Sequence, residues 1–172
     1  MIRVTVFNEY VHERNEAKVR EVYPNGIHGA IAQALGGIED ITVKCVTMDM
    51  PENGLPQQLL DETDVLIWWA HLAHNLLLGT RSPVLRWREN DEQQRVWCVS
   101  PGHPIAAGLG ESFVIPKDET YGEYFEIPTP DELVFISWFS GGNVFRSGCC
   151  WKRGAGKIFY FQGGHETYPI YY

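Results

Sequence analysis

The stretch DVLIWWAHLAH, residues 64–74, decides the fold. It contains a continuous apolar run of strand length with no polar face, which is typical of a strand covered on both sides. The run ends at His71 and His74. In an open α/β sheet, ligands bind beyond the carboxyl ends of the strands. The stretch therefore predicts a buried strand, Asp64–Trp69, and two imidazoles at the edge where a site is expected.

The segments before this strand alternate between strand and helix patterns. Apolar residues predict strands at Ile2–Phe7 and Ile41–Met48, with a helix at Gly26–Leu35 and a short helical turn at Gln57–Asp61. Residues 8–25 read as an irregular polar segment. Strand, helix, strand, helix, strand is the α/β pattern, so we expect a parallel sheet with right-handed crossovers.

The pattern breaks after His74. A parallel neighbour needs a crossover of a dozen or more residues, usually a helix, but no amphipathic helix precedes the next strand candidate, Arg95–Val99. Either the sheet is unusually small, or one crossover helix and one strand are absent, and we favour the second interpretation. Further on, Leu133–Phe139 and Val144–Trp151 flank a Gly-rich turn and predict an antiparallel hairpin, and Lys157–Phe161 predicts another strand. No linker or repeat is visible, so we expect a single α/β domain over residues 1–172.

Composition excludes several classes of protein. The chain has 172 residues, of which 44% are hydrophobic and 13% aromatic, and this composition is typical of a globular protein. Its net charge of -8 disfavours a nucleic-acid binder. No apolar run is long enough to span a membrane, and because the sequence starts with a strand pattern we expect no signal peptide. The four cysteines lack CxxC spacing and indicate buried thiols. We expect a cytoplasmic protein with no nucleic-acid or membrane partner.

Histidines are the first candidates for chemistry. His71 and His74, three residues apart, can share one face of a helical turn and bind one metal ion, or one of them can act as an acid or base. Alternatively, one caps a following helix and the other is solvated. His165 and Glu166 follow the last strand and two glycines. Such a pair can orient a tautomer or transfer protons, although a tight turn with exposed polar residues is the alternative.

Two loops carry further candidates. Glu9 follows the first strand and is expected at the same sheet edge as His71. Tyr121 and Glu123 lie in a Gly-punctuated loop and offer a phenol and a carboxylate. The alternative is that these side chains are exposed in surface loops and have no role in a site.

The cysteines are poor candidates for a nucleophile. Cys98, Cys149 and Cys150 lie inside apolar strand patterns, and none occupies a Gly-x-Cys-x-Gly turn. Buried packing is the better interpretation. The sequence also lacks a phosphate-binding glycine loop of the Walker or dinucleotide type.

Seven motifs, in order along nearly the whole chain, carry a family resemblance. They are VTVFNEY (4–10), YPNGIH (23–28), DVLIWWAHLAH (64–74), LRWRE (85–89), YGE (121–123), FRSGC (145–149) and GHETYP (164–169). The chain resembles the trehalose-utilisation (ThuA-like) family of the class I glutamine-amidotransferase-like superfamily. The resemblance implies a flavodoxin-like three-layer sandwich with a mostly parallel sheet, to which this chain adds a C-terminal β-hairpin. The family's crossover helix and following strand are missing after His74.

The resemblance also implies a role in disaccharide catabolism, on a glycoside or a 3-keto-glycoside. We expect a sugar-modifying enzyme (an isomerase, lyase or hydrolase) that uses acid–base chemistry, with or without a divalent metal such as zinc. In this hypothesis the metal ligands or acid–base groups are His71, His74 and His165. The groups that position sugar hydroxyls are Glu9, Tyr121, Glu123 and Glu166, and Trp69 stacks on the sugar.

The alternative to an enzyme is a non-catalytic module that binds a sugar or a partner. The sequence does not decide whether the protein forms a homo-oligomer. A glutamine hydrolase would share the fold, but the chain lacks an evident nucleophilic cysteine.

Overall fold

The computed structural model describes residues 1–70, 86–165 and 167–168, and the chain divides into two compact units. The N-terminal unit comprises residues 1–74 and 166–172, and the C-terminal unit residues 75–165. The expectation of one domain stays a prediction.

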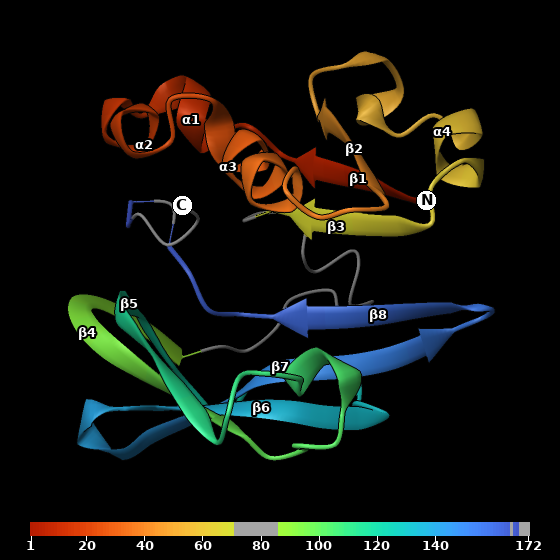
Figure 1. Ribbon diagram of the computed structural model, residues 1–172. Helices are drawn as coiled ribbons and strands as arrows, with labels where there is room; N and C mark the ends of the chain where they lie inside the picture. Colours follow the sequence, from red (N-terminus) through yellow and green to blue (C-terminus); the bar gives the residue numbers. More distant parts are fainter. Residues whose placement is uncertain (71–85, 166, 169–172) are drawn as a thin grey trace. The chain divides into compact units, whose positions relative to one another are not determined.

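The N-terminal unit is built on three parallel strands, β1 (Ile2–Asn8), β2 (Ile41–Thr47) and β3 (Val65–Trp69), in the order β2-β1-β3 (Figure 1). Short helices connect them: α1 (His12–Asn15), α2 (Ala17–Val22), α3 (Gly26–Leu35), η1 (Pro51–Gly54) and α4 (Gln57–Asp61). The expected strands and the helix over residues 26–35 are confirmed. The segment over residues 8–25, expected to be irregular, instead contains α1 and α2.

Helices cover both faces of this sheet. On one face, Leu59 of α4 packs against Phe7 and Val46, with Trp68 stacked on Phe7 at 4.3 Å between ring centroids. The opposite face carries a second cluster in which Trp69 packs against Val19 of α2, Ile27 of α3 and Tyr23 between these helices. The adjacent indoles therefore pack on opposite faces, as successive residues of a strand must.

The doubly covered strand is β1 and not β3. β1 is the central strand and is buried from Val4 to Asn8. β3 lies at the end of the described sheet, where Val65 and Leu66 are 44% and 37% exposed. The prediction that residues 64–69 are buried on both faces is therefore wrong for the first half of that strand.

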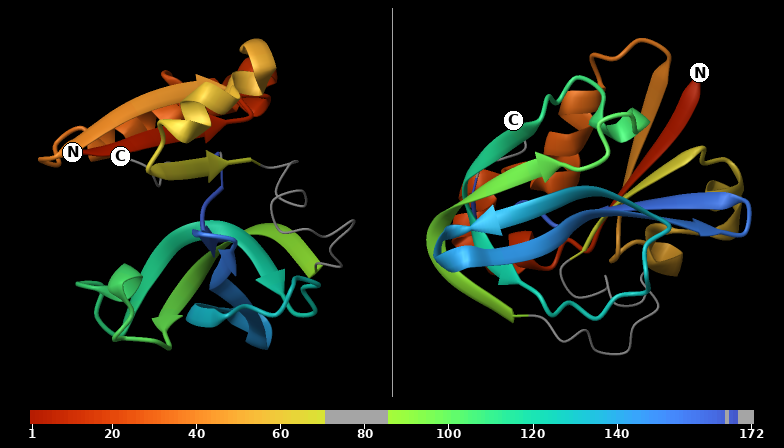
Figure 2. Two further views of the ribbon diagram at one scale, coloured as in Figure 1. Left: turned by 90° about the vertical axis from the view of Figure 1, so that its right-hand side faces the viewer. Right: turned by 90° about the horizontal axis from the view of Figure 1, so that it is seen from below.

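The C-terminal unit is a five-stranded antiparallel sheet in the order β5-β4-β6-β7-β8. Its strands are β4 (Arg86–Cys98), β5 (Ser112–Gly122), β6 (Glu132–Phe139), β7 (Asn143–Arg153) and β8 (Gly156–Phe161), with η2 (Pro104–Ala106) and η3 (Ser140–Gly142) between strands. Figure 2 shows how strongly β4 and β5 curve. Their pairing contains irregularities between Arg88 and Gln94, which bend a sheet locally.

Aromatic side chains fill both faces of this sheet. The main core on one face consists of Tyr121, Phe125, Phe139, Phe145, Cys149 and Trp151. On the other face, Phe135 packs over Gly148, where a Cβ would lie 2.5 Å from the Phe135 ring. Gly148 is therefore required for the ring to sit against the strand.

The fold prediction is wrong. A flavodoxin-like, mostly parallel sandwich was expected, but the described strands form a three-stranded parallel sheet and a separate five-stranded antiparallel sheet. The reason lies in the connections: turns such as Ser140–Gly142 and Arg153–Gly156 are too short for crossovers and join antiparallel neighbours. The expected hairpin and the strand over residues 157–161 are confirmed. The break after His74 lies outside the described residues.

Two smaller expectations concern the cysteines and membranes. All four cysteines are free thiols, but only Cys149 is buried and the other three are half-buried. Among the described residues, no helix combines the length and apolarity needed to cross a bilayer.

Candidate functional site

The last residues of β5 place two polar side chains of the C-terminal unit together. Residues 118–122 are buried without interruption, so the carboxylates of this run lie away from water. Glu119 and Tyr121 are two residues apart and therefore point to the same side of the strand. The Tyr121 hydroxyl donates a hydrogen bond to Glu119 Oε2. Burial, followed by the Glu119 carboxylate, raises the pKa of Tyr121, so Tyr121 remains a phenol that donates to Glu119.

His165 meets Glu119 from the segment that follows β8. Its Nε2 lies 3.0 Å from Glu119 Oε1, and the residue is 5% exposed. Asp118 anchors this segment, because its carboxylate accepts the backbone N–H groups of Gly164 and Glu119 at 3.0 and 2.9 Å. Burial raises the pKa of Asp118 to about 6 despite these hydrogen bonds.

Glu89 of β4 brings a third group to this cluster. Its Oε1 lies 3.9 Å from His165 Nε2, and its side chain is 51% exposed. The cluster is therefore buried at His165 and Glu119 and open to solvent at Glu89.

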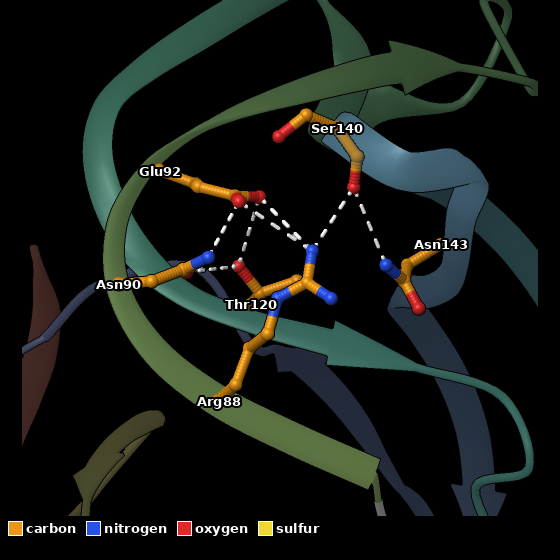
Figure 3. Close-up of polar contacts among 6 residues, drawn as sticks. All are labelled: Arg88, Asn90, Glu92, Thr120, Ser140 and Asn143. Atoms are coloured by element: carbon orange, nitrogen blue, oxygen red, sulfur yellow. Dashed lines mark hydrogen bonds and ion pairs between the residues drawn. The ribbon is translucent and has the colours of Figure 1, made fainter.

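Polar contacts on both sides of Glu89 hold its strand in place (Figure 3). Arg88 Nη2 donates to Glu92 Oε2 at 3.3 Å and to the Ser140 carbonyl at 3.1 Å. Asn90 donates to Glu92 and accepts from the Thr120 hydroxyl at 2.9 Å. Because Arg88 and Asn90 flank Glu89, these contacts tie the Glu89 backbone to β5 and to the turn after β6.

The cluster can act in two chemical ways. A carboxylate that accepts an imidazole N–H fixes the tautomer of the ring and stabilises its protonated form, which is what acid–base catalysis by histidine needs. Alternatively, Glu89, Glu119 and His165 each offer one ligand atom, and these atoms lie within 4.8 Å of one another. Imidazole nitrogen and carboxylate oxygen are both ligands of zinc.

Comparison with known proteins identifies the family. The ThuA family model, described as trehalose utilisation, matches residues 72–172, which is more than half of the chain. The chain belongs to this family. The ThuA match contains the whole cluster of Glu89, Glu119, Tyr121 and His165, and it suggests a role in trehalose utilisation. No curated protein matches the chain.

The predicted site residues are only partly brought together. His165 and Tyr121 both contact Glu119, and so belong to one cluster. His71, His74 and Glu166 lie outside the described residues. The predicted metal set of His71, His74 and His165 therefore stays a prediction.

Two predicted residues belong to the N-terminal unit, where Glu9 is buried and Trp69 is half-buried. Glu9 is 6% exposed, and its backbone N–H donates to the Trp69 carbonyl at 3.2 Å. Trp69 packs against α2 and α3. In α1, the Glu13 carboxylate accepts from Asn8 at 2.6 Å and from the Ile27 backbone N–H at 3.1 Å. Glu13 therefore holds the start of α3, and the roles predicted for Glu9 and Trp69 in sugar binding stay predictions.

Glu123 joins β5 to β7. It accepts four hydrogen bonds: from Phe125 N at 2.9 Å and from Arg146 N, Nε and Nη2 at 3.2, 2.8 and 3.1 Å. Burial alone would raise the pKa of Glu123, but the Arg146 hydrogen bonds outweigh it and lower the pKa. Glu123 shares no contact with His165 among those described, and its observed contacts are those of a structural residue.

Sequence reasoning missed Glu119, Asp118 and Glu89. The available signal was the run Lys117–Tyr121, where two carboxylates enter a strand that ends in an aromatic residue. A strand in which two carboxylates are buried must supply partners for them. Here those partners are Tyr121, Gly164 and His165.

Proposed function

We propose that the chain is a sugar-modifying enzyme of disaccharide catabolism, which acts on a glycoside or a 3-keto-glycoside by acid–base chemistry. His165 is the proposed acid–base group, and Glu119 is its partner. The observation that carries the proposal is the 3.0 Å contact between His165 Nε2 and Glu119 Oε1, made by two side chains that are almost fully buried. The family's role in trehalose utilisation supports a sugar as the substrate.

In the proposed step, Glu119 accepts a hydrogen bond from His165 Nε2–H and so fixes the orientation of the imidazole that exchanges protons with the sugar. With a 3-keto-glycoside, the imidazole takes a proton from the carbon beside the carbonyl, whose oxygen gains the negative charge. The imidazolium, stabilised by Glu119, then returns a proton to the sugar. Tyr121 orients Glu119 through its hydrogen bond. Glu89, half-exposed, accepts hydrogen bonds from sugar hydroxyls.

Turnover by matched variants tests this proposal. Trehalose and a 3-keto-glycoside are incubated with wild type, His165→Gln, Glu119→Gln and Glu126→Gln. The first two variants should lose about 100-fold or more in turnover, the usual size of a general acid–base effect. Glu126→Gln is the control, because Glu126 is exposed and stands outside the cluster. Equal rates in all four proteins would contradict the proposal. Sugar binding by wild type without turnover would instead support a non-catalytic module.

A divalent cation bound by Glu89, Glu119 and His165 is the second candidate, favoured by the 4.8 Å grouping of their ligand atoms. Catalytic zinc sites have three protein ligands and an open fourth position. Nε2 would then bind the ion instead of a proton, and Tyr121 would orient the Glu119 ligand. Elemental analysis after mild purification separates the two candidates. About one equivalent in wild type, lost in Glu89→Gln, supports the metal. A content below roughly a tenth of an equivalent supports acid–base chemistry alone.

A further inference from the structure

A pocket of about 360 Å³ lies in the C-terminal unit, away from the His165 cluster. Its floor is a row of residues paired directly across three strands: Glu132 of β6, Cys150 of β7 and Phe159 of β8. Directly paired residues of antiparallel strands share one face of the sheet. His103 and Ile105, at the start of η2, line one side of the pocket. A pocket of this size suits a small ligand such as a sugar.

One end of the pocket offers hydrogen bonds to hydroxyl groups. His103 Nδ1 accepts the Ile105 backbone N–H at 3.2 Å, so in the neutral ring the proton is on Nε2. This nitrogen lies 3.7 Å from Glu132 Oε2 and 3.9 Å from Cys150 Sγ. Burial raises the pKa of Cys150, which keeps it a thiol and a weak hydrogen-bond partner. The Nε2–H donor and the half-exposed Glu132 carboxylate are therefore available to a ligand hydroxyl between them.

The other end carries two positive charges. Lys152 and Lys157 are exposed and lie directly opposite each other on β7 and β8. Like charges in this position repel. Within the described part of the chain, neither ammonium group has a recorded ion pair with a carboxylate. Asp131 also lines the pocket, but its carboxylate accepts the Lys152 backbone N–H at 2.7 Å. In a chain of net charge -8, this lysine pair marks a place for an anion.

Apolar side chains also line the pocket. Phe159 is 38% exposed and Ile105 is 36% exposed, and both line the pocket. An aromatic ring and an aliphatic side chain suit the C–H face of a pyranose. We propose that this pocket binds an anionic sugar, whose phosphate or carboxylate lies between Lys152 and Lys157, whose ring packs on Phe159, and whose hydroxyls bond to Glu132 and His103. The proposal is independent of the proposed acid–base chemistry, because no pocket residue belongs to the His165 cluster.

Calorimetric titration of the whole chain tests it with four probes: glucose 6-phosphate, glucuronate, glucose and inorganic phosphate. Glucose 6-phosphate carries a phosphate and glucuronate a carboxylate on closely related rings. The sugar that binds more tightly therefore shows which anionic group the pocket takes. At least one should bind about tenfold or more tightly than both glucose and phosphate, which corresponds to about 1.4 kcal/mol. Equal binding of glucose would overturn the role of the lysines. Equal binding of phosphate would overturn the role of the sugar, and no binding of either charged sugar would overturn the whole proposal.

Lysine variants give the second arm. Lys152→Gln and Lys157→Gln should each weaken binding of the preferred charged sugar by about tenfold and leave binding of glucose unchanged. Lys117→Gln is the matched control, because Lys117 is an exposed lysine of the same sheet that does not line the pocket. Equal weakening by all three substitutions would indicate a general charge effect and contradict the pocket. Thermal unfolding checks that each variant is folded.

Discussion

Glu123→Gln should destabilise the C-terminal unit, although Glu123 was a sequence-based candidate for sugar binding. The carboxylate accepts four N–H groups, two on each oxygen. A glutamine keeps one oxygen and turns an NH₂ group toward the other two donors, so two hydrogen bonds are lost. Hydrogen bonds to charged groups are each worth about 1.5–3 kcal/mol. Because about a third of both side chains is exposed, we discount the total to about 2–4 kcal/mol.

The assay is urea denaturation followed by tryptophan fluorescence, at pH 7 and at lower pH. The lowered pKa of Glu123 means that its stabilisation is complete above the unfolded value of 4.5 and is lost as the pH falls through the folded pKa. The deficit of the variant should therefore shrink in acid. Glu126→Gln is the control and should change the free energy of unfolding by less than about 0.5 kcal/mol. A Glu123→Gln variant with wild-type stability but no turnover would refute the reasoning and restore a direct role in the reaction.

Three further predictions concern burial. Asp118 has a folded pKa of about 6, above its ordinary value of 3.8, so its contribution to stability falls as the pH rises between these values. In denaturation experiments, the stability of Asp118→Asn relative to wild type should therefore increase by about 2.4 kcal/mol between pH 4 and pH 7, and a constant difference would contradict the burial argument. Phe145→Ala, at a fully buried position, should lower the free energy of unfolding by about 3–5 kcal/mol in the same assay, and a loss below about 1 kcal/mol would contradict the assigned core. Burial raises the pKa of Cys149 to about 11, so mass spectrometry after alkylation at pH 8 should find Cys149 unmodified in the folded protein and modified in urea.

Local patterns predicted the elements whose signals lie within the elements themselves. The helix at Gly26–Leu35 follows from its apolar spacing and the glycine after it, and the β6–β7 hairpin follows from Gly141 and Gly142, both of which adopt positive φ. β5 was missed because Pro116 and the charged residues after it hide its alternation. The long β4 begins with an exposed, charged segment that has no apolar face.

The candidate site was only half predictable for a related reason. His165 was predicted from its place after a strand pattern and two glycines. Glu119 could not be, because its burial depends on a partner 46 residues away in the chain. The prediction of the global topology failed for the same reason. The residue pattern of a strand does not specify whether the neighbouring strand is parallel or antiparallel, because the length of the connection determines the direction.

The central claim is that His165 and Glu119 work as one acid–base unit. The most direct test is the turnover of a 3-keto-glycoside by His165→Gln, Glu119→Gln and the double variant, each checked for folding by circular dichroism. Residues that act as a unit are strongly non-additive. The account predicts that the double variant loses no more activity than His165→Gln alone. Losses that multiply, or wild-type activity in either single variant, would contradict it.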